Sequence, residues 1–159
     1  MLIREAIFRF QNETFAGYAF YSSAVLLKTL AMGGMTAFRR IQCGVYSNPE
    51  DAKLFLGPSG KVTVDERVER LRRNHLNDLE NVLPFVSLGF LYMATQPDDT
   101  VALWHFRLFA ASRFLHTASY QFQWPQPSRF IFHLVCLAVN LSMGVQVIMK
   151  AIQDDFSLN

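Results

Sequence analysis

Charged residues are distributed so unevenly along this chain that their distribution limits what it can fold into. Two stretches lack Asp, Glu, Lys and Arg altogether, a run of 17 residues at 81–97 and a run of 20 residues at 130–149. Two further stretches, residues 14–38 and 100–128, carry only three such side chains between them. A helix that crosses the hydrocarbon core of a bilayer needs about 20 mainly apolar residues. The pattern therefore predicts a helical membrane protein.

We predict an all-helical fold of one domain, residues 1–159, with four hydrophobic helices in an integral membrane bundle. The predicted helices cover residues 14–38, 65–95, 100–122 and 128–152, with a polar loop at 39–64. A composition of 51% hydrophobic and 18% charged residues also fits a soluble bundle. However, these helices are apolar on nearly every side, and a chain of this length cannot bury four of them from water.

Lys and Arg are concentrated in one short connection, which predicts how the bundle is oriented. Residues 39–73 hold eight Lys or Arg and five Asp or Glu, whereas the turn at 96–99 holds no Lys or Arg. The positive-inside rule places the loop at 39–64 in the cytosol and both termini on the other side. We expect the first helix to be an uncleaved anchor. The net charge of +2 and the two cysteines argue against a nucleic-acid binder and a disulfide scaffold.

Polar side chains recur at helical spacing inside the predicted spans, where they are costly unless they form a site or a polar interior. One face of the second helix, at its cytosolic end, carries Arg70, Arg73, Asn77 and Glu80. The third helix carries a second set on one face, and an arginine begins the fourth helix: Arg113, His116, Tyr120 and Arg129.

These groups all lie toward the predicted cytosolic end of the bundle, and two interpretations fit them. Arginines bind carboxylates through paired hydrogen bonds, so the cluster suits a ligand with several carboxylates and one ammonium group. Alternatively, the same residues form interhelical ion pairs, such as Glu80 with Arg113, and anchor the helices at the interface. We find no zinc-ligand spacing, Gly-rich phosphate loop or Ser-His-Asp pattern, and predict no metal site.

Residues 66–81 read ERVERLRRNHLNDLEN, and this motif resembles the signature of the MAPEG family, the membrane-associated proteins in eicosanoid and glutathione metabolism. Shorter motifs fit the same family: Asn48-Pro49-Glu50-Asp51, His105-Phe106-Arg107-Leu108-Phe109 and Pro125-Gln126-Pro127-Ser128-Arg129. The resemblance runs from about residue 12 to 150 and is nearest to the branch of microsomal glutathione S-transferases of type one.

The resemblance implies a four-helix subunit that forms a homotrimer in the endoplasmic reticulum or the outer mitochondrial membrane. It implies that glutathione, as co-substrate, lies between neighbouring subunits on the cytosolic side, with Arg40 reaching the neighbour's glutathione. The other glutathione-binding residues that it implies are Arg73, His75, Asn77, Glu80, Arg113, His116, Tyr120 and Arg129. Among these, Arg113 would support the site, and His75 would have a weaker, positioning role.

The chemistry that the resemblance implies is activation of a thiol. Arg129 would lie beside the glutathione sulfur, where a guanidinium favours the thiolate. A free thiol titrates near pH 8.5, and lowering its pKa by two units takes about 2.7 kcal/mol. The second substrate would be a hydrophobic electrophile or a lipid hydroperoxide that enters from the bilayer. The expected activities are glutathione transfer and glutathione-dependent peroxidase activity.

Some positions depart from related branches of the family. The prostaglandin E synthase branch has a serine and a tyrosine where this chain has Phe130 and His133, and an arginine where it has Leu76. Mammalian type-one transferases have a cysteine where this chain has Ala52. Two alternatives stay open, a prostaglandin E synthase-like isomerase and a non-catalytic protein that binds glutathione or lipid. Comparing the turnover of a prostaglandin endoperoxide with that of an aryl halide tests the first alternative, and the Arg129→Ala variant tests the second.

Overall fold

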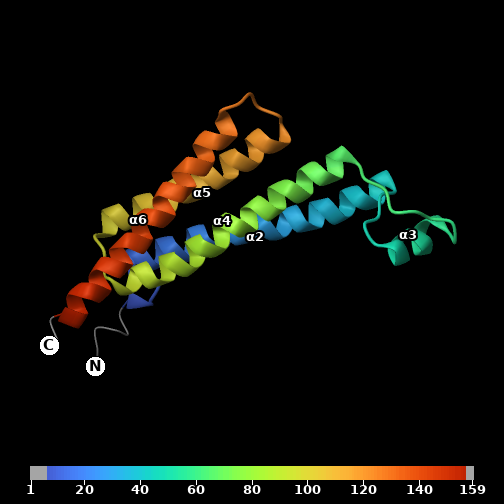
Figure 1. Cartoon of the computed structure of the whole chain (residues 1–159). Helices are drawn as coiled ribbons and strands as arrows, with labels where there is room; N and C mark the ends of the chain where they lie inside the picture. Colours follow the sequence, from blue (N-terminus) through green and yellow to red (C-terminus); the bar gives the residue numbers. More distant parts are fainter. Residues whose placement is uncertain (1–6, 157–159) are drawn as a thin grey trace. The chain divides into compact units, whose positions relative to one another are not determined.

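The computed structural model describes residues 7–156, with side chains up to residue 154, and the chain in this range is helical (Figure 1). The helices are α2 (Glu13–Cys43), α3 (Pro49–Leu56), α4 (Glu66–Ala94), α5 (Asp99–Gln121) and α6 (Ser128–Phe156). No β-strand occurs between residues 7 and 156, so the all-helical prediction is confirmed.

The main difference from the predicted helices lies in the expected loop at 39–64. Helix α2 continues to Cys43, and α3 occupies Pro49–Leu56 within that loop. Pro49 is the first residue of α3, a position where the missing proline N–H costs no helical hydrogen bond. Gly57 follows the last residue of α3, and its φ of 89° suits glycine. The Asn48-Pro49 pair therefore marks the start of a helix as well as a turn.

Side chains just before two of the long helices explain where these helices begin. The Asn12 side-chain oxygen accepts a hydrogen bond from the Phe15 backbone N–H at 2.8 Å, before α2. The Asp98 carboxylate accepts from the Val101 N–H at 3.0 Å and caps α5 in the same way. Such caps satisfy N–H groups that have no partner within the helix.

The chain divides into two compact units, which we call the large unit (residues 7–26 and 80–156) and the small unit (residues 27–79). The core of the large unit is aromatic: the Phe85 and Phe109 rings stack at 3.8 Å, and Phe106 packs edge-on to Phe85. Tyr18 donates a hydrogen bond to the Val86 carbonyl at 2.7 Å. A Cβ on Gly89 would come within 2.7 Å of the Tyr18 ring, so this contact between α2 and α4 requires glycine.

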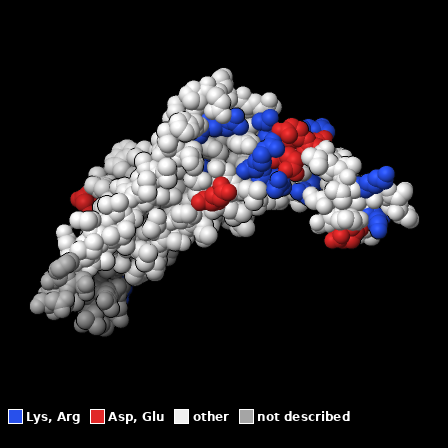
Figure 2. All heavy atoms as spheres, in the orientation of Figure 1, with Lys and Arg blue, Asp and Glu red and all other residues white. Residues whose placement is uncertain are grey.

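The small unit combines the end of α2, α3 and the start of α4. Ala52 of α3 is completely buried, and a Cβ on Gly60 would lie 2.2 Å from the Ala52 carbonyl oxygen. The Tyr46 and Phe55 rings, also in this unit, stack with their centres 5.0 Å apart. Figure 2 shows that charged atoms gather around α3 and the start of α4, whereas long stretches of the other helices present uncharged atoms on the visible face.

Among the helices of residues 7–156, only α6 is by itself long and apolar enough to cross a membrane, over Ser128–Asp154. The other long helices carry the charged and polar side chains noted above, such as Lys28 in α2 and Arg107 and Arg113 in α5. Insertion of all four helices in a membrane therefore remains a prediction.

Candidate functional site

The residues predicted to bind glutathione are shared between the two units. The small unit holds Arg40, Arg73, His75 and Asn77, and the large unit holds Glu80, Arg113, His116, Tyr120 and Arg129. In the sequence of α4, Arg73, Asn77 and Glu80 follow one another at the spacing of one helix face.

In the large unit, three of the predicted residues lie close together where the turn at residues 122–127 joins α5 to α6. The His116 and Tyr120 rings lie 5.9 Å apart, one turn from each other on α5. The Arg129 guanidinium carbon lies 4.8 Å from the centre of the Tyr120 ring, a cation–π contact. The structure thus brings His116, Tyr120 and Arg129 into one cluster.

The turn at residues 122–127 helps to orient the Arg129 side chain. With the Gln126 amide turned so that its oxygen faces Arg129, this oxygen accepts from Nη2 at 2.6 Å and from Nε at 2.9 Å. The hydrogen bonds determine this orientation, because in the opposite orientation the Gln126 NH₂ group would face the N–H donors of Arg129. A guanidinium has five N–H donors, so three remain for another partner.

Arg113 precedes His116 by one turn on the same face of α5 and is completely buried. An arginine that anchors a helix at the membrane interface keeps its head group in polar surroundings. The burial of Arg113 therefore argues against the anchoring interpretation for this residue and fits a supporting role one turn before His116. Glu80, in contrast, is exposed.

In the small unit, the first turns of α4 carry a group of exposed ion pairs. The Glu66 carboxylate contacts Arg73 Nη2 at 2.5 Å and Arg70 Nη2 at 3.9 Å. The Arg73 side chain is 43% exposed and Asn77 is half-buried, so solvent reaches both side chains. Exposed pairs of this kind contribute little to stability, typically under about 1 kcal/mol.

His75 and Arg40 lie in different surroundings from Arg73. His75 packs against α2, where a Cβ on Gly33 would lie 3.3 Å from the imidazole Cε1. This close approach of two helices supports the weaker, positioning role predicted for His75. Arg40, in the last turn of α2, donates a hydrogen bond to the Ser47 hydroxyl.

Sequence reasoning missed a buried polar pair in the small unit. Lys28 Nζ lies 2.6 Å from Asp78 Oδ1, and the two side chains are only 8% and 0% exposed. Asn74, one turn before Asp78 on α4, is completely buried, and neither amide atom has a hydrogen-bond partner. The one available signal was Lys28 itself, the single charge in residues 14–38, which needs a counter-charge.

Asp65 stands immediately before α4 and is held by Arg67. Its carboxylate accepts from the Arg67 backbone N–H at 2.8 Å and from the Arg67 guanidinium at 3.1 and 2.8 Å. These hydrogen bonds to the ionised form lower the pKa of Asp65 from 3.8 to about 2. Among the side chains that the structure describes, up to residue 154, no three His, Cys, Asp or Glu groups are close enough to hold a metal ion.

Comparison with known proteins identifies the family. The model of the MAPEG family matches residues 18–149. The chain is 43% identical to microsomal glutathione S-transferase 1 of Sus scrofa over 141 residues, and the alignment covers 87% of this chain and 91% of that protein. It is 42% identical over 140 residues to the Homo sapiens protein of the same name, covering 86% and 90%. It is 34% identical over 130 residues to prostaglandin E synthase of Equus caballus, covering 82% and 84%.

The family model thus spans most of the chain, and the relatives align over nearly their whole lengths. The arginine-rich start of α4 and the cluster of His116, Tyr120 and Arg129 both fall within the matched region. We conclude that this chain belongs to the MAPEG family.

Proposed function

We propose that this protein is a membrane-bound glutathione transferase that conjugates glutathione to hydrophobic electrophiles and reduces lipid hydroperoxides. The observation that carries the proposal is 43% identity to a microsomal glutathione S-transferase 1 over 91% of that protein's length. The arrangement of charge in this chain supports the same conclusion, as follows.

Glutathione carries two carboxylates, one ammonium group and one thiol, and the proposed site offers a partner for each. Arg73 and Arg40 supply guanidinium groups, which bind carboxylates through paired hydrogen bonds. Glu80 is exposed and carries the opposite charge, which suits the ammonium group. Asn77 and His75 are the further α4 residues of the proposed site, and Arg113 is its supporting residue on α5.

Arg129 is the proposed catalytic residue. Gln126 and Tyr120 hold its side chain, and this preorganisation reduces the entropy lost when it binds an anion. The remaining N–H donors stabilise the thiolate, which attacks the electrophilic carbon of the second substrate. A carbon–sulfur bond forms, and the leaving group departs with the bonding electron pair.

With a lipid hydroperoxide, the same thiolate attacks the terminal peroxide oxygen. The oxygen–oxygen bond breaks, and the lipid leaves as an alcohol after taking up a proton. The sulfenic acid formed on glutathione condenses with a second glutathione thiol, giving the disulfide and water. This step needs no reductant other than glutathione.

We further propose that the protein is a homotrimer in the endoplasmic reticulum or the outer mitochondrial membrane, with the site facing the cytosol. The concentration of Lys and Arg between residues 39 and 73 supports this orientation. Helix α6 supports membrane insertion by its length and apolar composition. Hydrophobic second substrates then reach the site from the bilayer.

The test is a glutathione titration of the detergent-purified protein, followed at the ultraviolet absorbance band of the thiolate. If Arg129 lowers the thiol pKa by about two units, the thiolate fraction at pH 7 is about 0.8 instead of about 0.03. Arg129→Ala should then remove nearly all of the thiolate absorbance and slow conjugation of an aryl halide about 25-fold. Arg129→Lys should retain part of both, because it keeps the charge but loses the planar fork.

The matched control is Arg107→Ala. Arg107 is another arginine of the α5–α6 region, exposed, with its guanidinium 5.6 Å from the Trp104 ring. This variant should keep the thiolate band and the rate. If Arg129→Ala behaves like Arg107→Ala, the catalytic proposal is wrong, and a binding role without catalysis is favoured.

An isomerase that acts on prostaglandin endoperoxides is the second candidate. The 34% identity to a prostaglandin E synthase favours it, but the identity to the transferases is higher. Phe130 and His133 stand in the first turns of α6, close to Arg129, and lack the hydroxyls of that branch. We therefore expect turnover of an aryl halide to exceed turnover of a prostaglandin endoperoxide.

A further inference from the structure

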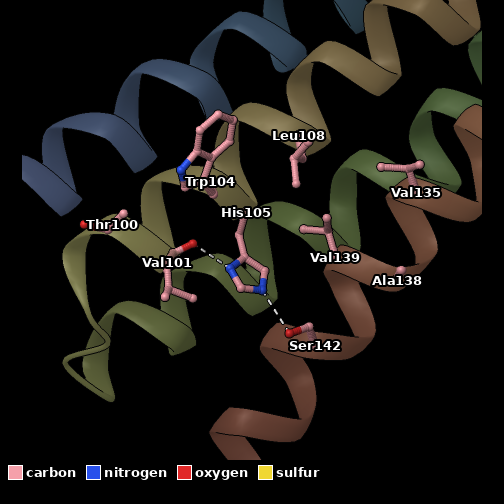
Figure 3. A pocket seen from close by; sticks show the side chains of 9 residues that line it. All are labelled: Thr100, Val101, Trp104, His105, Leu108, Val135, Ala138, Val139 and Ser142. Atoms are coloured by element: carbon pink, nitrogen blue, oxygen red, sulfur yellow. Dashed lines mark hydrogen bonds between the residues drawn. The ribbon is translucent and has the colours of Figure 1, made fainter.

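A groove of about 420 Å³ lies between α5 and α6 in the large unit, and none of its lining residues is proposed to bind glutathione. Its wall is mainly apolar, with Trp104 and Leu108 from α5 and Ala138 and Val139 from α6 (Figure 3). Trp104 and Leu108 are 54% and 46% exposed, so the groove is open to the surroundings. Its volume is at the lower end of the range for small-molecule sites, roughly 300–1,000 Å³.

Two polar side chains meet at the groove and fix each other's hydrogen bonds (Figure 3). His105 Nδ1 lies 2.8 Å from the Val101 carbonyl oxygen, and Nε2 lies 2.9 Å from Ser142 Oγ. A carbonyl can only accept, so in the neutral imidazole the proton is on Nδ1 and Nε2 is an acceptor. The Ser142 hydroxyl therefore donates to His105.

This arrangement determines what Ser142 can offer to a ligand. Its one proton is used by His105, and Gln146 Nε2 donates to its oxygen at 3.3 Å. A hydroxyl oxygen has two lone pairs, so one lone pair remains. The groove can thus accept a hydrogen bond from a ligand. It contributes no charged side chain among its lining residues, so it disfavours a carboxylate or an ammonium group.

We propose that this groove binds a neutral single-chain lipid that carries a hydroxyl group, such as a long-chain alcohol. The apolar chain covers Trp104, Leu108 and Val139, and the hydroxyl donates to Ser142. Helix α6, which forms one wall, is the helix of the described chain that is apolar enough to cross a membrane, so a lipid is the available occupant. The proposal does not depend on the glutathione chemistry, because Arg129 and Tyr120 do not line the groove.

The experiment uses Trp104 as the reporter. The chain has two tryptophans, so Trp124→Phe leaves Trp104 as the single one. The full-length protein in detergent is titrated with a brominated long-chain alcohol, since bromine quenches tryptophan fluorescence on contact. The methyl ether of the same alcohol is the comparison, because it has the same chain and no donor. We expect saturable quenching, with the alcohol binding about fivefold more tightly than the ether.

Three variants in this background test the geometry. Ala138→Phe fills the groove and should abolish saturable quenching, whereas Ala151→Phe makes the same change at an exposed position of α6 and should not. Ser142→Ala should weaken binding of the alcohol to the level of the ether. All three variants should conjugate a water-soluble aryl halide as fast as the Trp124→Phe protein does, and this rate reports the proposed glutathione site separately.

Other results would overturn the proposal. Quenching that rises without saturation, or that is the same in Ala138→Phe, means that the groove is not a binding site. Equal affinity for alcohol and ether means that Ser142 does not select a hydroxyl. If Ala138→Phe instead changes the molar mass measured by light scattering, the groove is an interface between copies of the chain. If the Trp124→Phe protein shows saturable quenching but does not conjugate the aryl halide, this result counts against the proposed function and leaves the groove proposal standing.

Discussion

At the scale of single residues, the buried pair of Lys28 and Asp78 gives the clearest energetic prediction. The charged atoms lie 2.6 Å apart, and both side chains are almost inaccessible. Removing one partner of a buried pair leaves an uncompensated charge and typically costs about 3–5 kcal/mol, whereas replacing both by apolar residues is often close to neutral. We expect Lys28→Leu and Asp78→Leu each to lower the unfolding midpoint strongly, and the double variant to recover most of the loss.

The control for this prediction is an exposed pair on α4. Arg72 Nε lies 2.8 Å from Glu69 Oε2, and these side chains are 45% and 20% exposed. The corresponding single Leu variants should cost less than about 1 kcal/mol. Denaturant unfolding in detergent, followed by circular dichroism, measures both pairs. Equal effects at the two pairs would mean that Lys28 and Asp78 are hydrated in the folded protein.

The predicted site residues also differ from one another in burial, which spacing along a helix does not reveal. Arg113 is completely buried, whereas the Arg73 side chain is 43% exposed. Helical periodicity identified both arginines as members of polar faces. It gave no means of predicting which face would be covered, because burial depends on the neighbouring helices. For the same reason, the sequence did not show that Lys28 pairs with Asp78 of α4.

At the scale of helices, the start of α4 should depend on pH. Arg67 holds the pKa of Asp65 at about 2, below its ordinary value of 3.8. A carboxyl whose pKa is lower in the folded state stabilises that state fully above about pH 4, and this stabilisation is lost as pH falls toward 2. We therefore expect the first turn of α4 to fray over this interval, with faster amide exchange at residues 67–69.

A carboxyl titration by nuclear magnetic resonance measures this pKa directly. The Asp65 signal should titrate near pH 2, and Arg67→Gln should move the midpoint back toward 3.8 because it removes the charged donor. A midpoint near 3.8 in the unaltered chain would show that Asp65 and Arg67 do not pair in solution. Asp65→Asn keeps a capping side chain without the charge, and should remove the pH dependence of the exchange rates.

The starts of the long helices were predictable because charge-free stretches and proline turns delimit them, whereas α2 ends at Cys43 and not at residue 38 as predicted. Helix α6, predicted at residues 128–152, begins at Ser128 as expected. The short helix α3 was not predicted, since eight residues form too weak a helix to be identified without their tertiary contacts. Those contacts are the burial of Ala52 and the tight packing of Gly60 against it. Neither contact has a pattern that sequence reasoning recognises.

At the scale of the whole molecule, the proposed trimer leads to a complementation test. The proposal takes Arg40 from one subunit and Arg129 from its neighbour to complete each glutathione site. Arg40→Ala trimers and Arg129→Ala trimers should each be impaired, since every site in them lacks one arginine. When the two variants are co-expressed, a site with intact Arg129 from one subunit and intact Arg40 from the next is restored. Random mixing in a closed three-fold ring restores about a quarter of the sites.

Purification through a different affinity tag on each variant isolates the mixed trimers. Their rate of aryl halide conjugation should then exceed that of either parent trimer, and glutathione should again produce a thiolate absorbance band. If each subunit instead builds a site from its own Arg40 and Arg129, every site in a mixed trimer carries one defect, and the rate stays between those of the parents. The experiment therefore distinguishes shared sites from separate ones, because subunit mixing can repair a site only when two chains contribute to it.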